Sequence, residues 1–385
     1  MSKLIINRRS LLKAGAASLF LAGMPVSGLA KGKPTGRICV IILQGGMDGL
    51  ATVPPIGDPD LMRMRKAITP ENYLPLNDFF GLHPALKFYA QLMARGHASA
   101  VHATAFPYTK RSHFEGQNLV EGGGLTPFSE KTGWLGRALD LAGVAGRSLS
   151  LDMPLILRGH HDNDNFYPAS IRGSSRPSAR LLEKIAIGHD MAAAQVFTKV
   201  ARKSEENIQV PRDPASLAQY AGQAMAKADG PLASVIRVDD FDTHANQVYK
   251  DNTDEGRLAR QLGVVDEVIA GYRRGLGNAW NETIILTLTE FGRTVAANGT
   301  WGTDHGYGSV GLLAGGTLAA NGVVADWPGL SKKDQFDKRD LMATIDYRSV
   351  CAACVEKTLG LEHDVIASQV FRQPDLPRVF DHLFT

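Results

Sequence analysis

The stretch NETIILTLTEFGRTVAANGTWGTDHGYG, residues 281–308, decides the fold that we expect. It begins with Thr283–Leu288, a short apolar run rich in β-branched side chains, which is typical of a central strand in a parallel sheet. Charged residues follow where the apolar run stops. In an open α/β sheet, ligands bind beyond the carboxyl ends of strands, so four side chains fall where chemistry is expected: Glu290, Arg293, Asp304 and His305. The alternative is a surface loop in which these acids and bases pair with each other.

Three other segments repeat the pattern of a strand followed by a loop rich in possible ligands. The first is Ile38–Leu43, which breaks at QGGMDGL, residues 44–50. The glycines allow a sharp turn and a close approach to a ligand, and Asp48 sits at the strand end. An aspartate also satisfies turn amides with its own side chain, so a ligand and a turn residue are both open interpretations.

The second segment is Ala98–Ala103, which leads to RSHFEGQ, residues 111–117, at the start of an expected helix. Ser112 has two interpretations. It is an N-cap, with Glu115 three residues later completing a capping box. Alternatively, it is a hydroxyl that the helix N-terminus activates as a nucleophile or an anion binder.

The third segment is Leu232–Val238, which ends in DDFDTH, residues 239–244. Asp242 and His244 are two residues apart, so both side chains point the same way in an extended backbone. This arrangement suits two ligands of one cation. The alternative is a histidine that is only hydrogen-bonded.

Strands that alternate with helix-period segments predict an α/β fold, with a mostly parallel central sheet sandwiched by helices. Residues 31–385 are expected to form a single domain, and helix-period patterns within 175–228 predict an added helical layer or cap. Further strands are expected in the ranges 148–157 and 308–314, and helices in the ranges 85–95, 134–142, 255–273 and 346–359.

The first thirty residues have the features of a twin-arginine (Tat) export signal. The sequence NRRSLLK, residues 7–13, precedes the apolar run Ala14–Val26, and small residues follow at Gly28 and Ala30. We expect cleavage after Ala30, the Tat export machinery as a partner, and a periplasmic or secreted location. Because no later stretch reaches about eighteen apolar residues, no transmembrane span is expected in the mature chain. An uncleaved signal anchor is the alternative.

The composition is that of a globular protein, with 44% hydrophobic and 21% charged residues. Loss of residues 1–30 would remove four basic and no acidic side chains, which lowers the formal charge from +3 to −1. A near-neutral mature chain has no electrostatic footprint for nucleic acid, so we expect no such partner.

Two of the three cysteines, Cys351 and Cys354, are spaced like a redox pair or half a zinc site. Because no second cysteine or histidine pair stands nearby in the sequence, ordinary buried thiols are expected.

As a set, six motifs resemble the domain-of-unknown-function 1501 family, which consists of Tat-exported bacterial proteins placed in the alkaline phosphatase/sulfatase superfamily. The resemblance runs over essentially the whole mature chain. The motifs are QGGMDGL (44–50), RSHFEGQ (111–117), FDTH (241–244), TEFGRT (289–294), GTDHG (302–306) and DYR near residue 346.

This resemblance implies a mostly parallel sheet between helices, with the site at the strand ends. It also implies two divalent cations held by Asp and His side chains, and a Ser, Thr or formylglycine nucleophile at a helix start. Matched by position, Asp48 corresponds to the acid after the first strand, Ser112 to the nucleophile, Asp242 and His244 to one ligand pair, Glu290 to the acid after the later strand, and His305 to a further ligand.

Metal ions at such a site polarise a phosphoryl or sulfuryl oxygen, and two of them about 3.5–4 Å apart can clamp the attacking and leaving oxygens. Arg111 or Arg293 could bind the remaining oxyanion oxygens bidentately. One or two ions of Zn, Mg, Mn or Ca are expected. The candidate ligands are Asp48, Asp242, His244, Glu290, Asp304 and His305.

Two departures from the superfamily pattern concern these ligands. Active members often have Asp-His after the late strand, where this chain has Glu290-Phe291, and a phenylalanine cannot ligate a metal. The spacing between Asp242 and His244 is also shorter than in many relatives. One of the two metal positions is therefore expected to be weakened or lost.

The function that these observations favour is an exported, metal-dependent hydrolase of small-molecule or polymer esters of phosphate or sulfate, in which Ser112 attacks in line. The alternative is a non-catalytic periplasmic or surface binding protein on the same fold, with a degenerate metal site. A catalytic site needs Ser112 within reach of a cation held by Asp48 and Glu290. In a structural site these acids pair with arginine or backbone.

Overall fold

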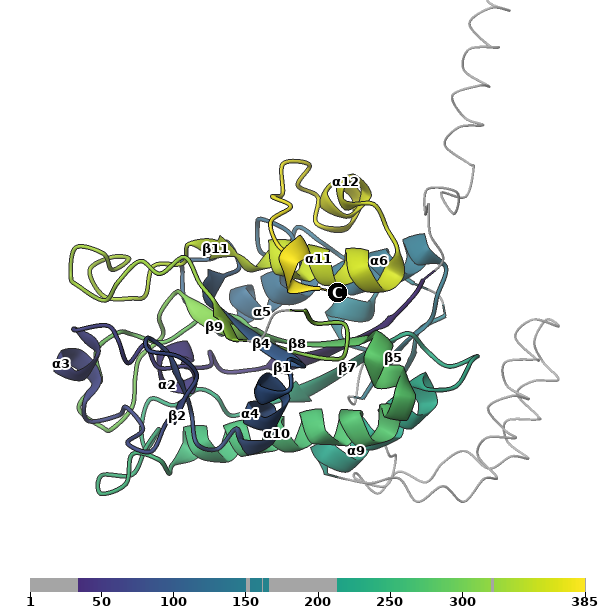
Figure 1. Ribbon diagram of the computed structural model, residues 1–385. Helices are drawn as coiled ribbons and strands as arrows, with labels where there is room; N and C mark the ends of the chain where they lie inside the picture. Colours follow the sequence, from purple (N-terminus) through teal and green to yellow (C-terminus); the bar gives the residue numbers. More distant parts are fainter. Residues whose placement is uncertain (1–33, 150–152, 161, 166–212, 320–321, 385) are drawn as a thin grey trace, which may run out of the picture.

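The computed structural model describes residues 34–149, 153–160, 162–165, 213–319 and 322–384. Within these ranges, nine strands form one sheet in the order β10-β4-β9-β8-β1-β7-β5-β6, and β11 pairs with β4 (Figure 1). The strands are β1 (Arg37–Leu43), β4 (Ala98–Ala105), β5 (Gly146–Ser148), β6 (Asp164–Asn165), β7 (Ala233–Val238), β8 (Thr283–Thr289), β9 (Ser309–Ala314), β10 (Gly322–Val324) and β11 (Ile345–Asp346).

Most of the sheet is parallel. The central strand β1 pairs in parallel with both neighbours, and Ile38 lies opposite Ala233 of β7 and Ile284 of β8. Strand β9 is antiparallel to β4 and to β8. The mostly parallel sheet expected from the sequence is therefore confirmed, with one antiparallel strand that the apolar pattern did not indicate.

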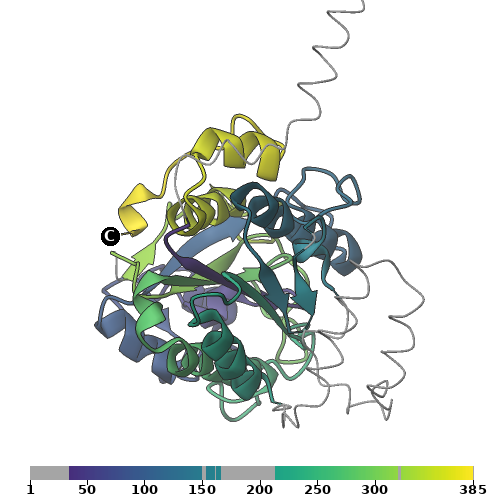
Figure 2. The same ribbon diagram turned by 90° about the vertical axis from the view of Figure 1, so that its right-hand side faces the viewer.

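Helices cover both faces of the sheet, as Figures 1 and 2 show. In β1, Ile38, Val40 and Ile42 belong to one hydrophobic core, and the alternate residues Cys39, Ile41 and Leu43 belong to the other. A strand buried on both faces reads as a continuous apolar run, which is what residues 38–43 show. The first core includes side chains of α5 (His113–Gly122), α6 (Trp134–Ala142) and α11 (Tyr347–Leu359); the second includes those of α4 (Lys87–Ala94), α9 (Pro214–Met225) and α10 (Arg257–Leu276).

The helices expected from the sequence are present with small changes at their ends, but two local expectations differ from the structure. The range 148–157 does not form strands throughout, because β5 ends at Ser148 and Leu155–Leu157 is a 3-10 helix. Of the expected layer in 175–228, the described part is α9, which packs beside α10 on one face of the sheet. Residues 175–212 of that range, and the export signal at 1–30, lie outside the described residues.

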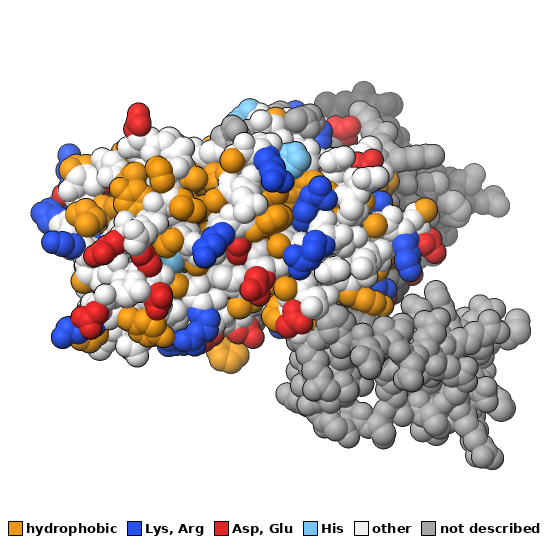
Figure 3. Space-filling view, turned by 60° about the horizontal axis from the view of Figure 1, so that its bottom comes forward, with side chains coloured by type: hydrophobic (Ala, Val, Ile, Leu, Met, Phe, Trp, Pro, Cys, Tyr) orange, Lys and Arg blue, Asp and Glu red, His pale blue; other side chains and the backbone are white. Residues whose placement is uncertain are grey.

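Acidic and basic side chains are interspersed over the face seen in Figure 3. Across the described ranges, no helix combines the length and the apolar character that a bilayer crossing requires. Cys351 and Cys354 are buried in α11 as free thiols, and burial raises the pKa of both. Buried thiols of this kind are unreactive, in agreement with the expected packing role.

Candidate metal centre

The site is built at the edge of the sheet where β4, β7 and β8 end. These strands run in the same direction, because β9 is antiparallel to both β4 and β8 and β1 is parallel to both β7 and β8. The loops that follow them therefore meet at one edge. They bring together His113 at the start of α5, Asp242 and His244 after β7, Glu290 and Arg293 after β8, and Asp304 and His305 before β9.

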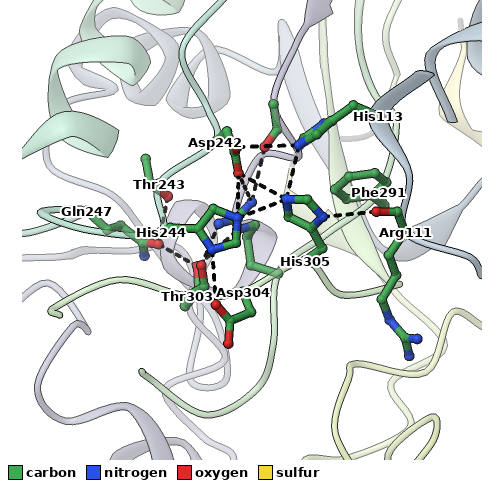
Figure 4. Close-up of polar contacts among 12 residues, drawn as sticks. Arg111, His113, Asp242, Thr243, His244, Gln247, Phe291, Thr303, Asp304 and His305 are labelled. Carbon is green, nitrogen blue, oxygen red and sulfur yellow. Dashed lines mark hydrogen bonds and ion pairs between the residues drawn. The ribbon is translucent and has the colours of Figure 1, made fainter. Parts of the chain in front are cut away.

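Three side chains form the centre of this cluster. His113, Asp242 and His305 each offer a ligand atom, and these atoms lie within 4.8 Å of one another. The Nε2 atom of His305 is 3.0 Å from Nε2 of His113 and 3.2 Å from Oδ1 of Asp242. His244 adjoins them, because its Nε2 lies 3.0 Å from Nε2 of His305 and 3.1 Å from Oδ1 of Asp242. Figure 4 shows the imidazole rings turned toward one another around the aspartate.

The other nitrogen of each imidazole faces an oxygen acceptor. Nδ1 of His113 lies 2.7 Å from Oε1 of Glu290, and Nδ1 of His244 lies 3.0 Å from Oδ1 of Asp304. Nδ1 of His305 lies 2.9 Å from the backbone carbonyl oxygen of Arg111. Because carboxylates and carbonyls only accept, each Nδ1 carries the hydrogen. In a neutral imidazole the Nε2 lone pair is then left pointing into the cluster.

Phe291 forms a wall behind two of these rings. Its side chain is 2% exposed, and its ring centroid lies 4.9 Å from the rings of both His113 and His305. The residue that cannot ligate a metal therefore restricts the positions of two imidazoles that can.

Arg293 neutralises much of the charge of Asp242. Its Nη1 donates to Oδ1 of Asp242 at 2.7 Å, and its Nε donates to the hydroxyl of Thr303 at 3.1 Å. Burial opposes ionisation of Asp242, but the hydrogen bond and charge of Arg293, together with the nearby His244 and His113, hold its pKa below the ordinary value. The Arg293 side chain is fully buried and also donates to the carbonyls of Gly45 and Thr303. Its guanidinium is thus committed within the protein rather than presented to an oxyanion.

The pKa values of the two central histidines, His113 and His305, are shifted in opposite directions. The hydrogen bond to Glu290 raises the pKa of His113 despite partial burial. Burial lowers the pKa of His305, and the nearby His113 and Arg293 add to this effect. At the rim, burial acts to raise the pKa of Asp304, but the hydrogen bond from His244 is among the contacts that keep it below its ordinary value. The cluster thus favours a neutral His305 beside an ionised Asp242.

Asp48 lies outside this cluster, in a buried polar chain behind it. One carboxylate oxygen pairs with the guanidinium of Arg65 and accepts from Nε2 of Gln247 at 2.6 Å, and the other accepts from the amide of Ala51 at 3.2 Å. Oε1 of Gln247 in turn accepts from the hydroxyl of Thr303 at 2.7 Å. That hydroxyl accepts from Nε of Arg293. Asp48 is thus the N-cap of the short helix α2 (Gly49–Thr52) and the start of a chain that reaches Asp242.

Ser112 is the N-cap residue of α5, with an extended backbone, but its side chain makes no cap hydrogen bond. The capping box, one of the two interpretations of Ser112, is not formed: the amide of Ser112 donates to the hydroxyl of Tyr108 at 3.0 Å, and that hydroxyl donates to Glu115 at 2.8 Å. Arg111 precedes Ser112, and its guanidinium points away from the histidines (Figure 4). The guanidinium donates to Asp340 and Asp337.

The structure brings Asp242, His244 and His305 together as the sequence suggested. It places Glu290 and Asp304, expected as ligands, behind histidines as their hydrogen-bond acceptors. His113 was missed. It follows β4 and obeys the same strand-end rule, but the neighbouring Ser112 was expected to be the site residue there.

The donor set fits a cation. With hydrogen on every Nδ1, the Nε2 lone pairs and the carboxylate face one another at 3.0–3.2 Å, which is repulsive unless a proton or cation lies among them. Tetrahedral zinc, with Zn–N bonds of about 2.0–2.1 Å, places its ligand atoms about 3.3 Å apart. Imidazole-rich sites suit zinc and related transition metals, whereas Mg and Ca prefer oxygen ligands.

Comparison with known proteins gives one family match. Residues 189–353 match the model of the family described as "Protein of unknown function (DUF1501)". The matched range is less than half of the chain, and it includes the FDTH, TEFGRT and GTDHG motifs. A search of curated proteins found no match.

Several solved structures are similar to the chain in outline. Ps i-CgsB in complex with k-i-k-neocarrahexaose has 10% identity and a TM-score of 0.43, covering 86% of this chain and 73% of that one. The C-terminal periplasmic domain of EcEptC from Escherichia coli has 10% identity and a TM-score of 0.43, covering 91% and 89%. The lipoteichoic acid synthase LtaP from Listeria monocytogenes has 11% identity and a TM-score of 0.42, covering 88% and 77%. At these identities and scores, the similarity says nothing of the activity of this chain.

Proposed function

We propose that the chain is a metal-dependent hydrolase of phosphate or sulfate esters, with one cation held by His113, Asp242 and His305 and adjoined by His244. This proposal rests on the hydrogen bonding of the three imidazoles. Each Nδ1 donates to an oxygen acceptor, and the Nε2 atoms all face the same space. Histidines that ligate a metal usually have this second hydrogen bond. Zinc is our first choice of ion on the donor set.

A cation bound there would act as a Lewis acid toward an ester oxygen. The chain's own residues hold the site ready for it. Arg293 fixes the carboxylate of Asp242, and Phe291 limits the rotation of two imidazoles. Glu290 is buried and also accepts from the amide of Gly45 at 2.8 Å, so it anchors His113 to the turn after β1.

Ser112 is the proposed nucleophile. Its hydroxyl is adjacent in sequence to His113 and is not used to cap α5. In this step Oγ forms a bond to the phosphorus or sulfur as the ester P–O or S–O bond breaks, and the proton lost by Oγ ends on the leaving ester oxygen, which departs as an alcohol. Water then releases the product from the serine. Asp48, Arg111 and Arg293 are internally paired, so we assign none of them to the substrate.

Metal content tests the proposal. The full chain, purified without chelator, is expected to hold about one equivalent of zinc or a related transition metal. His113→Ala and His305→Ala are expected to lose it. His97→Gln is the matched control, because His97 lies outside the cluster and pairs with Trp280. Metal-free wild-type protein that remains folded would refute the metal centre. Loss of metal from His97→Gln would mean that the losses in the site variants do not show which histidines bind the ion.

Activity is tested separately. Metal-loaded protein is assayed on aryl phosphates and aryl sulfates, and Ser112→Ala is expected to lose turnover while retaining the metal. Turnover that Ser112→Ala leaves unchanged would rule out the serine nucleophile without affecting the metal centre.

We also propose export by the Tat machinery to the periplasm or the outside of the cell, on the sequence of residues 1–30. The strand β1 begins at Arg37, so cleavage after Ala30 would leave the described fold intact. Mass spectrometry of the N-terminus of exported protein tests this, and a cytoplasmic uncleaved chain would contradict it.

A second candidate function is a non-catalytic binding protein, favoured by the pairing of its acids. Asp48 is paired with Arg65, Glu290 with the Gly45 amide, and Asp242 with Arg293. In this case a proton on His113, rather than a cation, would separate the Nε2 atoms. Turnover of aryl phosphates and aryl sulfates by metal-loaded protein distinguishes the two, because a non-catalytic protein turns over neither even where its site retains a cation.

A further inference from the structure

Arg111 has an unusual backbone conformation beside the metal centre. Its φ is +62°, in the left-handed region that side chains other than glycine rarely adopt. It lies between the end of β4 and Ser112, the N-cap residue of α5. In this conformation its carbonyl oxygen accepts the hydrogen on Nδ1 of His305 at 2.9 Å. A strained residue whose backbone touches a site residue points to a role for the strain.

The side chain of Arg111 is held in several ways. Its Nε donates to Oδ2 of Asp340 at 2.7 Å, its Nη2 lies 2.5 Å from the same oxygen, and Nη2 also donates to Asp337 at 2.8 Å. The Asp340 side chain is fully buried. The guanidinium further lies 5.7 Å from the ring centroid of Phe336. One segment, 336–340, thus supplies every one of these contacts.

The same segment also holds His305 directly. Nη2 of Arg339 donates to the backbone carbonyl of His305 at 2.8 Å. Arg111 and His305, which are joined by the hydrogen bond at Nδ1, are therefore both anchored to residues 336–340.

We propose that Arg111 is a positioning residue of the metal centre, whose ion pair with Asp340 keeps its backbone left-handed so that its carbonyl orients His305. The inference rests on the proposed metal centre, but it assigns to Arg111 a role distinct from binding substrate. With its Nδ1 hydrogen bound to this carbonyl, His305 presents its Nε2 lone pair to His113 and Asp242. Because Arg111 stands two residues before His113, the same restraint also sets where α5 begins.

Alanine and glycine distinguish this role from others. Both substitutions remove the guanidinium, but glycine adopts φ near +60° without steric cost and alanine does not. We expect Arg111→Ala to weaken zinc binding about tenfold, the lower end of the loss seen when a partner of a ligating histidine is removed. Arg111→Gly is expected to stay within about threefold of wild type. The measurement is the zinc dissociation constant of the full chain, by competition with a chelator.

Arg372 provides the matched control. It also has a left-handed backbone, with φ +56°, and its ion-pair partner is Glu130, which pairs with Arg137 rather than with a residue of the metal centre. Arg372→Ala and Arg372→Gly are expected to differ in stability but to bind zinc as the wild type does.

Asp340→Asn tests the restraint from the other side. It is expected to weaken zinc binding in the wild-type background and to have little effect in the Arg111→Gly background, where no guanidinium needs to be held. Comparing Asp340→Asn in these two backgrounds also tests the proposal if Arg111→Ala does not fold.

A second readout does not depend on metal. The ¹⁵N chemical shifts of the His305 ring in metal-free protein are expected to show hydrogen on Nδ1 in the wild type and in Arg111→Gly. In Arg111→Ala a mixture of the two neutral forms is expected. If the wild type bound no zinc, the proposed function would fail and these shifts would still decide the role of Arg111. Equal zinc affinity and equal ring shifts for the alanine and glycine variants would overturn the inference and leave the metal centre standing.

Discussion

At the scale of single residues, two carboxylates that do not point into the cluster are expected to control its affinity for metal. Glu290 is buried and accepts from His113, whereas Asp304 is half exposed and accepts from His244. Replacing such a carboxylate typically costs about 10–100-fold in metal affinity. We expect Glu290→Gln to fall in this range and Asp304→Asn below it, because water can replace an exposed acceptor. The measurement is zinc affinity, and an equal loss in both variants would contradict the ranking.

Phe291 offers a second prediction at this scale. Phe291→Ala opens a cavity beside two imidazoles and is expected to lower the free energy of unfolding by about 3–5 kcal/mol. It should also weaken zinc binding, because His113 and His305 gain freedom to rotate. Phe371→Ala is the control, since Phe371 is fully buried against Trp134 in the core. Urea unfolding should show a similar loss in both variants, and zinc titration a loss in the first alone.

Single residues were predictable where the backbone decides their place. Asp242 and His244 follow a strand directly, so the strand-end rule located them. Asp48 follows a strand too, but its carboxylate turns to Arg65, seventeen positions later in α3 (Leu61–Arg65). Nothing in the local sequence shows that partner. His113 was overlooked because the sequence cannot say which of two adjacent polar residues faces the site.

At the scale of elements, the ion pair between Asp48 and Arg65 joins the turn after β1 to the loop after β8. Both side chains are fully buried, and Arg65 also donates to the carbonyls of Thr294 and Val295. Removing one partner of a buried pair leaves an uncompensated charge, which costs about 3–5 kcal/mol. We expect this loss of unfolding free energy for Arg65→Met, with loss of zinc binding as the loop moves.

Arg63 is the control for that experiment, because it lies in the same helix and pairs with Asp60 at the surface. Exposed pairs contribute at most about 1 kcal/mol, so Arg63→Met should be nearly neutral. If the two substitutions cost the same in urea unfolding, the buried pair would not be the reason for the loss.

Element positions were more predictable than element partners. The apolar runs in β1, β4, β7 and β8 located these strands, since each is buried on both faces. The direction of β9 was not predictable, because an apolar run of six residues reads the same in either direction. The strands predicted in the range 148–157 were wrong at Leu155–Leu157 because a short apolar run does not distinguish a strand from other buried backbone. These residues are apolar, but they form a 3-10 helix.

At the scale of the whole molecule, two buried histidines make stability depend on pH. Burial lowers the pKa of His83 and of His102 to about 4. His102 shows why: its Nδ1 accepts from the amide of Ala103 at 2.7 Å and its Nε2 donates to the carbonyl of Val53 at 2.9 Å, so a second proton has no acceptor. Unfolded histidine takes up its proton near pH 6.5.

The unfolded chain therefore binds more protons than the folded one between about pH 6.5 and pH 4, and the free energy of unfolding falls as pH falls through this window. Each histidine contributes about 1.4 kcal/mol per pH unit there. Urea unfolding in the presence of chelator measures this slope, and His102→Gln should reduce it by one proton. The wild type and His102→Gln both contain the cluster histidines, so these contribute equally to the two slopes. An unchanged slope in His102→Gln would therefore contradict the assignment of this pH dependence to His102.

The antiparallel placement of β9 has a consequence for how such a site can change. The connection from β8 to β9, residues 290–308, leaves the sheet and returns to it at the same edge. A parallel neighbour would require a crossover through the helical layers instead. This one excursion carries four of the seven residues that meet at the site: Glu290, Arg293, Asp304 and His305. A new loop sequence there could exchange the chemistry of the site while every strand kept its place.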